Sequence, residues 1–177
     1  MRVIGGRSRG RRLAAKLPRT VRPTSDRVRE SIFDILGSQG GVEGLRTVDL
    51  FCGSGALGLE ALSRGAARAT FIERDPAALA ALRANIATCG AEARCRVIPG
   101  DALHPPAGDP AGLAFLDPPY AEGLSADAVA ALRGRSWFGP GTILILETAR
   151  ADALPDPGGE LLAERSHGVG RITVWRC

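Results

Sequence analysis

The sequence predicts an α/β fold: a mostly parallel sheet with helices on both faces and an antiparallel end. The first observation is that short apolar segments alternate with longer helical segments between residues 47 and 146, as in parallel sheets. The second is a glycine-rich turn directly after the first apolar segment. The third is a pair of strand-like segments near the C-terminus, residues 160–165 and 171–176, around Gly168 and Gly170. Together they predict one domain whose sheet closes with a hairpin.

The predicted helices have recognisable boundaries. Thr24 or Ser25 suits the N-cap of the first helix, and Gly37 is expected to terminate it. Asp75 followed by Pro76 predicts a capped helix start with a proline in the first turn. The expected helices cover residues 25–36, 56–64, 76–88 and 126–132, and the expected strands before the hairpin cover residues 47–51, 69–72, 94–98, 113–116 and 142–146.

The charge is distributed unevenly along the chain. Residues 1–29, the basic arm, hold ten basic side chains against one acid (+9), and residues 30–177 hold 13 basic against 18 acidic ones (−5), which together give the net charge of +4. A basic segment on a neutral-to-acidic body favours a polyanionic partner. A solvated, disordered tail is the alternative, but apolar residues and glycines interrupt the arm and favour a basic β-hairpin. Four arginines surround its expected turn at Gly10: Arg7, Arg9, Arg11 and Arg12.

Several classes of protein are disfavoured. No apolar run approaches the roughly 18 residues that a membrane-spanning helix needs, and the arginine-rich N-terminus lacks the apolar region of a secretory signal. The four cysteines form no C-x-x-C pair, and the two histidines, His104 and His167, are far apart in the sequence. We therefore expect a cytoplasmic monomer without a metal site or a membrane segment.

The glycine-rich turn is the first sign of a ligand site. Residues 49–58 read Asp-Leu-Phe-Cys-Gly-Ser-Gly-Ala-Leu-Gly and lead from a strand into a helix. Gly53 and Gly55 permit a tight turn and close backbone approach to a ligand, while the helix N-terminus offers free N–H groups. This pattern by itself also fits a nicotinamide or flavin cofactor, or a tight turn without a ligand.

Two carboxylates favour S-adenosylmethionine over a dinucleotide, and a third follows the next expected strand. Asp49 stands four residues before the first glycine of the turn, where it would attract the cationic methionine end of S-adenosylmethionine and repel a pyrophosphate. Glu73 stands 24 residues after Asp49 and is the candidate acceptor for the ribose hydroxyls; Asp75 competes for this role but suits a helix cap better. Asp101, followed by Ala102, would lie beside the adenine amino group, unless it is an ordinary loop aspartate.

The strongest chemical signal is the tetrapeptide Asp117-Pro118-Pro119-Tyr120, which follows the apolar strand at residues 113–116. An exocyclic amine of a nucleic-acid base is a poor nucleophile because its lone pair is delocalised into the ring. The Asp117 carboxylate and the Pro118 carbonyl can hold its hydrogens, and the two prolines make their loop rigid in advance. Tyr120 can stack on a base turned out of its helix. The alternative is a capped turn, since Asp-Pro is common in turns.

Nearly the whole chain resembles the RsmD-like family of 16S rRNA guanine-N2 methyltransferases. The glycine-rich turn and the tetrapeptide occur in many methyltransferases, whereas the first-helix pattern and the Leu-Ser-Arg-Gly ending of the second helix are more specific. The segments that carry the resemblance are residues 2–6 and 9–13 of the arm, 22–30 and 33–36 around the first helix, 49–65 around the glycine turn, and 71–75, 100–102 and 117–120.

The resemblance implies a Rossmann-like class I S-adenosylmethionine-dependent methyltransferase fold. It implies cofactor contacts at Asp49, Gly53, Gly55, Glu73 and Asp101 and amine-holding groups at residues 117–120. It also implies that the substrate is the small ribosomal subunit rather than naked RNA. On this basis we expect residues 1–40, the arm and first helix, to bind RNA, and residues 41–177 to form the catalytic domain. Cys52 departs from the family's usual alanine, and His167-Gly168 departs from its usual Tyr-Gly.

Three other classes of protein share part of the pattern. A DNA adenine-N6 methyltransferase uses the same tetrapeptide on a similar amine, but such enzymes usually carry a separate domain that reads bases in the groove. Only about 40 residues precede the first strand here, and no long insert interrupts the body. A nicotinamide-dependent oxidoreductase would leave Asp49 and the tetrapeptide unexplained. An RNA-binding protein without activity would not need an intact tetrapeptide.

Overall fold

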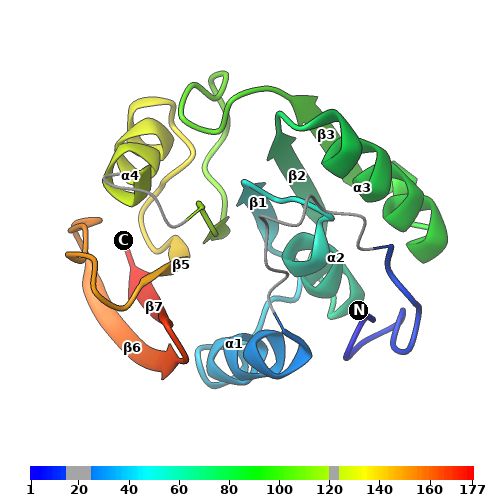
Figure 1. Ribbon diagram of the computed structural model, residues 1–177, viewed down its shortest axis with the longest axis horizontal. Coiled ribbons are helices and arrows are strands. Elements are labelled where there is room, and N and C mark those ends of the chain that lie inside the picture. The colour runs from blue at the N-terminus through cyan, green and yellow to red at the C-terminus, as the bar shows by residue number, and fades with distance from the viewer. Residues whose placement is uncertain (15–24, 120–123) are drawn as a thin grey trace.

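The computed structural model describes residues 1–14, 25–119 and 124–177. Its centre is a seven-stranded sheet with the order β3-β2-β1-β4-β5-β7-β6 (Figure 1). The first five strands in that order are parallel, and β7 and β6 complete the sheet as an antiparallel hairpin. The predicted sheet with an antiparallel end is therefore confirmed. The strands are β1 (Arg46–Leu50), β2 (Arg68–Glu73), β3 (Cys95–Pro99), β4 (Leu113–Leu116), β5 (Ile143–Ala149), β6 (Glu160–His167) and β7 (Gly170–Arg176).

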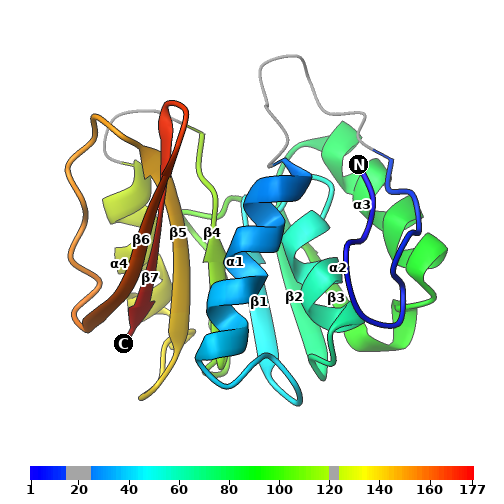
Figure 2. The same ribbon diagram turned by 90° about the horizontal axis from the view of Figure 1, so that it is seen from below.

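Helices cover both faces of the sheet, as the alternation of segments predicts. One face carries the first three helices, and the other carries the fourth (Figure 2). Side chains alternate along each strand, so Phe115 of β4 joins the apolar cluster of the first three helices, while its neighbour Leu116 joins the cluster of the fourth. The helices are α1 (Asp26–Ser38), α2 (Ala56–Ser63), α3 (Pro76–Cys89) and α4 (Leu124–Gly134), with a short 3-10 helix, η1 (Glu92–Arg94), before β3.

Two predicted helix starts are confirmed by their caps. The Ser25 hydroxyl accepts a hydrogen bond from the Val28 N–H at 3.3 Å at the start of α1. The Asp75 carboxylate accepts one from the Ala78 N–H at 2.7 Å at the start of α3. Each cap satisfies a backbone donor that the helix itself cannot pair. Thr24, the other candidate cap of α1, lies outside the described residues.

The predicted stop of α1 at Gly37 is wrong. The helix continues through Gly37 and ends at Ser38. The left-handed conformation that commonly follows a helix is adopted by the next two glycines instead, with φ values of +100° at Gly40 and +79° at Gly41. The Gly41 N–H then bonds to the Leu36 carbonyl at 2.9 Å, which closes the end of the helix. Three glycines within five residues made the choice ambiguous from sequence alone.

The described part of the basic arm, residues 1–14, is folded onto the body. It closes on itself through one antiparallel bridge between Arg2 and Arg12, so the predicted hairpin is reduced to a single bridge. Val3 and Leu13 are 1% and 5% exposed and pack in the cluster of the first three helices. A solvated tail is therefore wrong for these residues.

A buried carboxylate on α2 fixes the arm. Glu60 is 1% exposed and accepts the N–H groups of Ile4 and Gly5, each at 2.8 Å. It also accepts the Nε–H of Arg64 at 2.7 Å, so its charge is compensated where it is buried. Because these N–H groups of the arm bond to α2 and not to a second strand, the hairpin ladder stays short.

Arg29 of α1 ties this helix to the same arm. Its side chain is fully buried, and its Nη2 donates to the Arg2 carbonyl at 2.6 Å and to Asp26 Oδ1 at 2.9 Å. Burial lowers the pKa of Arg29, while the charges of Asp26 and Glu60 oppose that shift. The arm and α1 therefore pack as part of the body, and the functional division at residue 40 stays a prediction.

Gly6 and Gly10 form a matched pair for testing how the arm is docked. Both adopt the left-handed conformation, with φ values of +73° and +84°. A Cβ on Gly6 would lie 1.9 Å from the Ser63 carbonyl oxygen of α2, whereas a Cβ on Gly10 would meet no atom of the described residues within 4 Å. Gly10→Ala should therefore cost only the conformational penalty, about 1 kcal/mol. Gly6→Ala should displace the arm and lower the unfolding free energy by about 2–4 kcal/mol.

Urea unfolding of both variants, with limited trypsin digestion of the native proteins, measures this difference. Cleavage within the arm should accelerate in Gly6→Ala only. Equal losses of stability and unchanged digestion in both variants would show that the contact with α2 does not hold the arm.

Candidate active site

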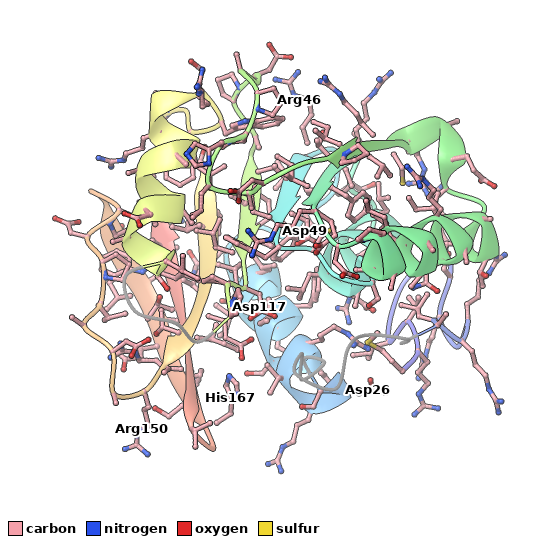
Figure 3. All side chains as sticks on the ribbon, turned by 45° about the horizontal axis from the view of Figure 1, so that its top comes forward. Asp26, Arg46, Asp49, Asp117, Arg150 and His167 are labelled. Atoms are coloured by element: carbon pink, nitrogen blue, oxygen red, sulfur yellow. The ribbon has the colours of Figure 1, made fainter. Side chains whose placement is uncertain are left out.

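The predicted site residues gather at one edge of the sheet. β1, β2, β3 and β4 are parallel neighbours, so their carboxyl ends meet at that edge. Asp49 lies near the end of β1, Glu73 ends β2, and Asp101 and Asp117 follow β3 and β4. Figure 3 shows Asp49 and Asp117 close together at the centre of the molecule. The sequence-based prediction that these carboxylates share one edge is confirmed, while their roles toward a ligand stay predictions.

The glycine turn between β1 and α2 has the backbone that its sequence suggested. Gly53 and Gly55 have φ values of +53° and +77°, and a Cβ on Gly55 would lie 2.3 Å from Leu82 Cδ1. Phe51 also has a positive φ, +56°, which is unusual for an aromatic residue and typical of functional loops. Gly55 is the N-cap of α2 and offers no side-chain cap. The N–H groups of Ala56 and Leu57 at the start of α2 can therefore face a ligand at this edge, whereas that of Gly58 bonds to Asp49.

Asp49 is a carboxylate buried inside the turn. It is 2% exposed, and its Oδ2 accepts the Gly58 N–H at 3.0 Å. Burial raises the pKa of Asp49 to about 7; the charge of Glu73 adds to the shift, and the bond from Gly58 opposes it. Among the described residues, no basic side chain forms an ion pair with Asp49. A cationic ligand group would relieve this unfavourable burial.

Glu73 joins the end of β2 to the glycine turn. Its Oε2 accepts the Gly53 N–H at 2.9 Å, and its Oε1 accepts the N–H groups of Arg74 and Asp75, each at 2.8 Å. A carboxylate has about four acceptor positions, so one remains for a ligand hydroxyl. Asp75 acts as the helix cap, as expected, and does not compete with Glu73.

The turn after β3 is organised by Asp101 itself. Its Oδ1 accepts the Leu103 N–H at 3.0 Å, and its Oδ2 lies 3.2 Å from His104 Nδ1. The bond from Leu103 lowers the pKa of Asp101, and the contact with His104 adds to this. Ala102 is 3% exposed and packs in the cluster around α4. An ordinary loop aspartate could make the same contacts, so a contact of Asp101 with adenine stays a prediction.

The Asp-Pro-Pro segment continues the most deeply buried strand. All four residues of β4 are at most 1% exposed. Asp117 is half-buried, Pro118 is buried and Pro119 is exposed. Tyr120 lies outside the described residues. The segment thus passes from the core to the surface one strand away from Asp49, where an acceptor pair can face a ligand bound at the glycine turn.

Cys52 occupies the glycine turn as a neutral thiol. Burial raises the pKa of Cys52 well above its usual value, and the charges of Asp49 and Glu73 add to that shift. The thiolate is the reactive form of cysteine, so this residue acts as a small filler in the turn. The replacement of alanine by cysteine therefore leaves the backbone geometry described above in place.

Two residues at this edge were missed as site candidates. Glu147 of β5 is 8% exposed, and its Oε1 lies 3.7 Å from Nε2 of His167 at the end of β6. The sequence contained a signal for the first, because a glutamate ends the apolar run Ile-Leu-Ile-Leu of β5. It contained none for the pair, since the two residues lie 20 positions apart.

No helix in the described part of the chain is long and apolar enough to cross a membrane. Within residues 1–14, 25–119 and 124–177, no group of three or more His, Cys, Asp or Glu side chains is arranged to hold a metal ion.

The strand order, the glycine turn after β1 and the Asp-Pro-Pro segment after β4 define the class I S-adenosylmethionine-dependent methyltransferase fold. The model of the family described as "Conserved hypothetical protein 95" matches residues 1–176, and the chain belongs to this family.

Relatives across nearly the full length agree with this assignment. The chain is 37% identical over 174 residues to "Ribosomal RNA small subunit methyltransferase D" of Escherichia coli strain K12, covering 97% of this chain and 86% of the relative. It is 36% identical to "Putative rRNA methyltransferase YlbH" of Bacillus subtilis strain 168, covering 99% and 98%. The solved structure of the putative methyltransferase yhhF from Escherichia coli superposes with a TM-score of 0.87 at 35% identity, covering 99% and 97%. The resemblance read from the sequence is confirmed.

Asp49 gives the fold a characteristic pH dependence. Its pKa in the folded protein, about 7, lies above the value of about 3.9 in an unfolded chain. Between these values the folded protein retains a proton that the unfolded chain has lost, so stability falls as the pH rises from about 4 to about 7. Asp49→Asn keeps an acceptor for Gly58 and stays neutral throughout. From pH 5 to pH 8.5 the wild type should lose about 2–3 kcal/mol of unfolding free energy relative to Asp49→Asn.

Urea unfolding of both proteins at these two pH values gives the difference directly. The cost of the asparagine N–H₂ group is the same at both pH values and cancels. Identical pH dependence in the two proteins would show that Asp49 ionises normally in the fold.

Proposed function

We propose that this protein transfers a methyl group from S-adenosylmethionine to the exocyclic N2 of a guanine in bacterial 16S ribosomal RNA, within the small ribosomal subunit in the cytoplasm. One observation carries the proposal: the Asp117-Pro118 acceptor pair lies one strand away from the buried Asp49 and its glycine turn. A methyl donor held at the turn would therefore face an amine held at the tetrapeptide. Membership of a family with relatives named rRNA methyltransferases supports the choice of substrate.

The residues of the turn fit this cofactor. Bound S-adenosylmethionine supplies a methyl group on a cationic sulfur, which makes that methyl carbon electrophilic. Asp49 would attract the ammonium of the methionine end, and the acceptor position left on Glu73 would take a ribose hydroxyl. Gly53 and Gly55 let the backbone approach closely. Asp101 and Ala102 would border the adenine ring.

The tetrapeptide would prepare the amine. The Asp117 carboxylate and the Pro118 carbonyl accept its two hydrogens, so that the nitrogen lone pair turns out of the ring plane toward the methyl carbon. Methyl transfer would join the nitrogen to that carbon while the electron pair of the carbon–sulfur bond stays on sulfur, and the methylated nitrogen would then lose a proton to water. Pro119 stiffens the loop, and Tyr120 would stack on the base.

The basic arm would bind the RNA. Arg7, Arg9, Arg11 and Arg12 have exposed side chains on a docked backbone, and Arg11 donates to the Thr88 carbonyl of α3. A docked backbone presents these charges in a fixed position, which reduces the entropy lost on binding. We accordingly assign RNA binding to residues 1–40 and catalysis to residues 41–177.

The first experiment tests the reaction. Small ribosomal subunits that lack the modification are incubated with the protein and tritiated S-adenosylmethionine, and the RNA is digested to nucleosides. The label is expected in N2-methylguanosine. Asp117→Ala should lower the rate by about two orders of magnitude or more with little change in cofactor affinity, while Asp127→Ala on the exposed side of α4 should not. Label in a different nucleoside, or full activity of Asp117→Ala, would contradict the proposal.

The second experiment tests the arm. Replacing Arg7, Arg9, Arg11 and Arg12 together by Ala should flatten the slope of log affinity for the particle against log salt by about two to four units, because each phosphate contact contributes roughly 0.7–0.9. A charge-matched control replaces four exposed arginines outside the arm, at or near the starts of β1, β2 and β3 and directly after α4: Arg46, Arg68, Arg96 and Arg135. Cofactor affinity should be normal in both. The same salt dependence of affinity in the arm variant and the wild type would show that these four arginines do not bind RNA phosphates.

A further inference from the structure

The pair formed by Glu147 and His167 lies beside the proposed amine site. Leu146 of β5 pairs with Leu116 of β4 in parallel register, and the next residues along the two strands are Glu147 and Asp117. Neighbouring strands are about 4.8 Å apart. The two carboxylate-bearing residues therefore stand next to each other across two strands, at the edge that carries Asp49.

Glu147 belongs to the face of the sheet that carries the first three helices. Ile145, two residues earlier on β5, packs in their cluster, so alternation along β5 puts Glu147 on that face. Phe115 of β4 packs in the same cluster, and Asp117 stands two residues after it, directly beyond the end of β4. In the view of Figure 3, Asp117 lies between Asp49 and His167, and His167 lies between the β6–β7 hairpin and α1. The face that would receive a base at Asp117 is thus also lined by Glu147.

His167 reaches Glu147 across an intervening strand. It pairs with Gly170 of β7, and β7 separates β6 from β5. Its Nε2 is buried and forms no hydrogen bond among the described residues, while it lies 3.7 Å from Glu147 Oε1. This contact is an ion pair at most, because the distance is too long for a hydrogen bond. A movement of about half an ångström by either side chain would bring this nitrogen within hydrogen-bond distance of the carboxylate, so His167 can position Glu147.

We propose that Glu147 accepts the N1–H of the target guanine while Asp117 and Pro118 hold its N2 hydrogens, and that His167 is a positioning residue for the Glu147 carboxylate. This inference rests on the proposed function. Guanine carries two adjacent donor groups, N1–H and the N2 amine, which match two acceptors on adjacent strands. Adenine has an unprotonated N1 beside its amine, and that nitrogen would face the Glu147 carboxylate with no hydrogen between them. The tetrapeptide alone suits the amine of either base. Glu147 would therefore make the site selective for guanine.

The test compares guanine with 2-aminopurine, which keeps the amine and has an unprotonated N1. Small subunits are reassembled with either base at the nucleotide that the tritium experiment identifies. The kcat/KM of the wild type should be at least about tenfold higher for guanine than for 2-aminopurine. Glu147→Gln should lower kcat/KM on guanine about tenfold or more. It should also narrow or reverse the preference for guanine over 2-aminopurine, because its amide N–H can donate to the unprotonated N1 of 2-aminopurine. Glu164→Gln, on the exposed part of β6, is the matched control.

The role of His167 is tested by rescue. His167→Gln retains an N–H donor at a similar reach, whereas His167→Phe removes it. His167→Gln should keep most of the activity on guanine, and His167→Phe should lose about tenfold, with S-adenosylmethionine affinity unchanged in both when measured by calorimetry.

The possible failures are distinguishable. If Glu147→Gln binds the cofactor but slows both bases equally, Glu147 is only structural and the inference is wrong while the proposed function stands. If Glu147→Gln does not fold, the two His167 variants decide instead: equal activity of both on guanine would show that the inference is wrong while the proposed function stands. If wild type does not methylate guanine N2 in the unmodified particle, the proposed function fails and this inference falls with it.

Discussion

The burial of the Asp49 carboxylate is the constraint on which the site depends. A carboxylate that is 2% exposed must be held by hydrogen bonds, and the N–H of Gly58 in the first turn of α2 provides one. A Cβ on Gly58 would lie 2.4 Å from the Phe71 ring and 3.2 Å from Asp49 Oδ2. Only a glycine lets α2 approach β1 and β2 this closely. That approach directs the N-terminus of α2, with its partial positive charge, toward the sheet edge.

The same helix connects the glycine turn to the basic arm. Glu60, two residues after Gly58, binds the backbone of the arm. Asn85 of α3 makes a second connection, because its Nδ2 donates both to the Ser54 carbonyl in the glycine turn and to the Ala14 carbonyl in the arm, at 2.9 and 3.0 Å. The arm therefore has a fixed position relative to the turn. A phosphate backbone bound by the arm would be held at a defined distance from the methyl donor.

Local signals in the sequence predict much of this structure, and long-range contacts explain what they miss. Asp75 before Pro76 specifies a helix start by itself, and the expected strand at residues 113–116 coincides with β4. The arm appears as a hairpin in sequence, but Glu60, 55 residues away, takes its N–H groups. The pair of Glu147 and His167 depends on the β7 strand between them, which no spacing reveals. The carboxylates that follow or end neighbouring parallel strands lie together at one edge of the sheet, as their positions at the ends of the expected strands suggested.

In the proposed function, Asp49 receives the cation of S-adenosylmethionine. At pH 6.5 a carboxylate with a pKa of about 7 is mostly protonated, and an arriving cation favours its ionised form, so binding must release a proton. Calorimetric titration of the cofactor in two buffers of different ionisation enthalpy measures that release. Wild type should release about half to three-quarters of a proton more per cofactor than Asp49→Asn. Equal release by the two proteins would contradict the account.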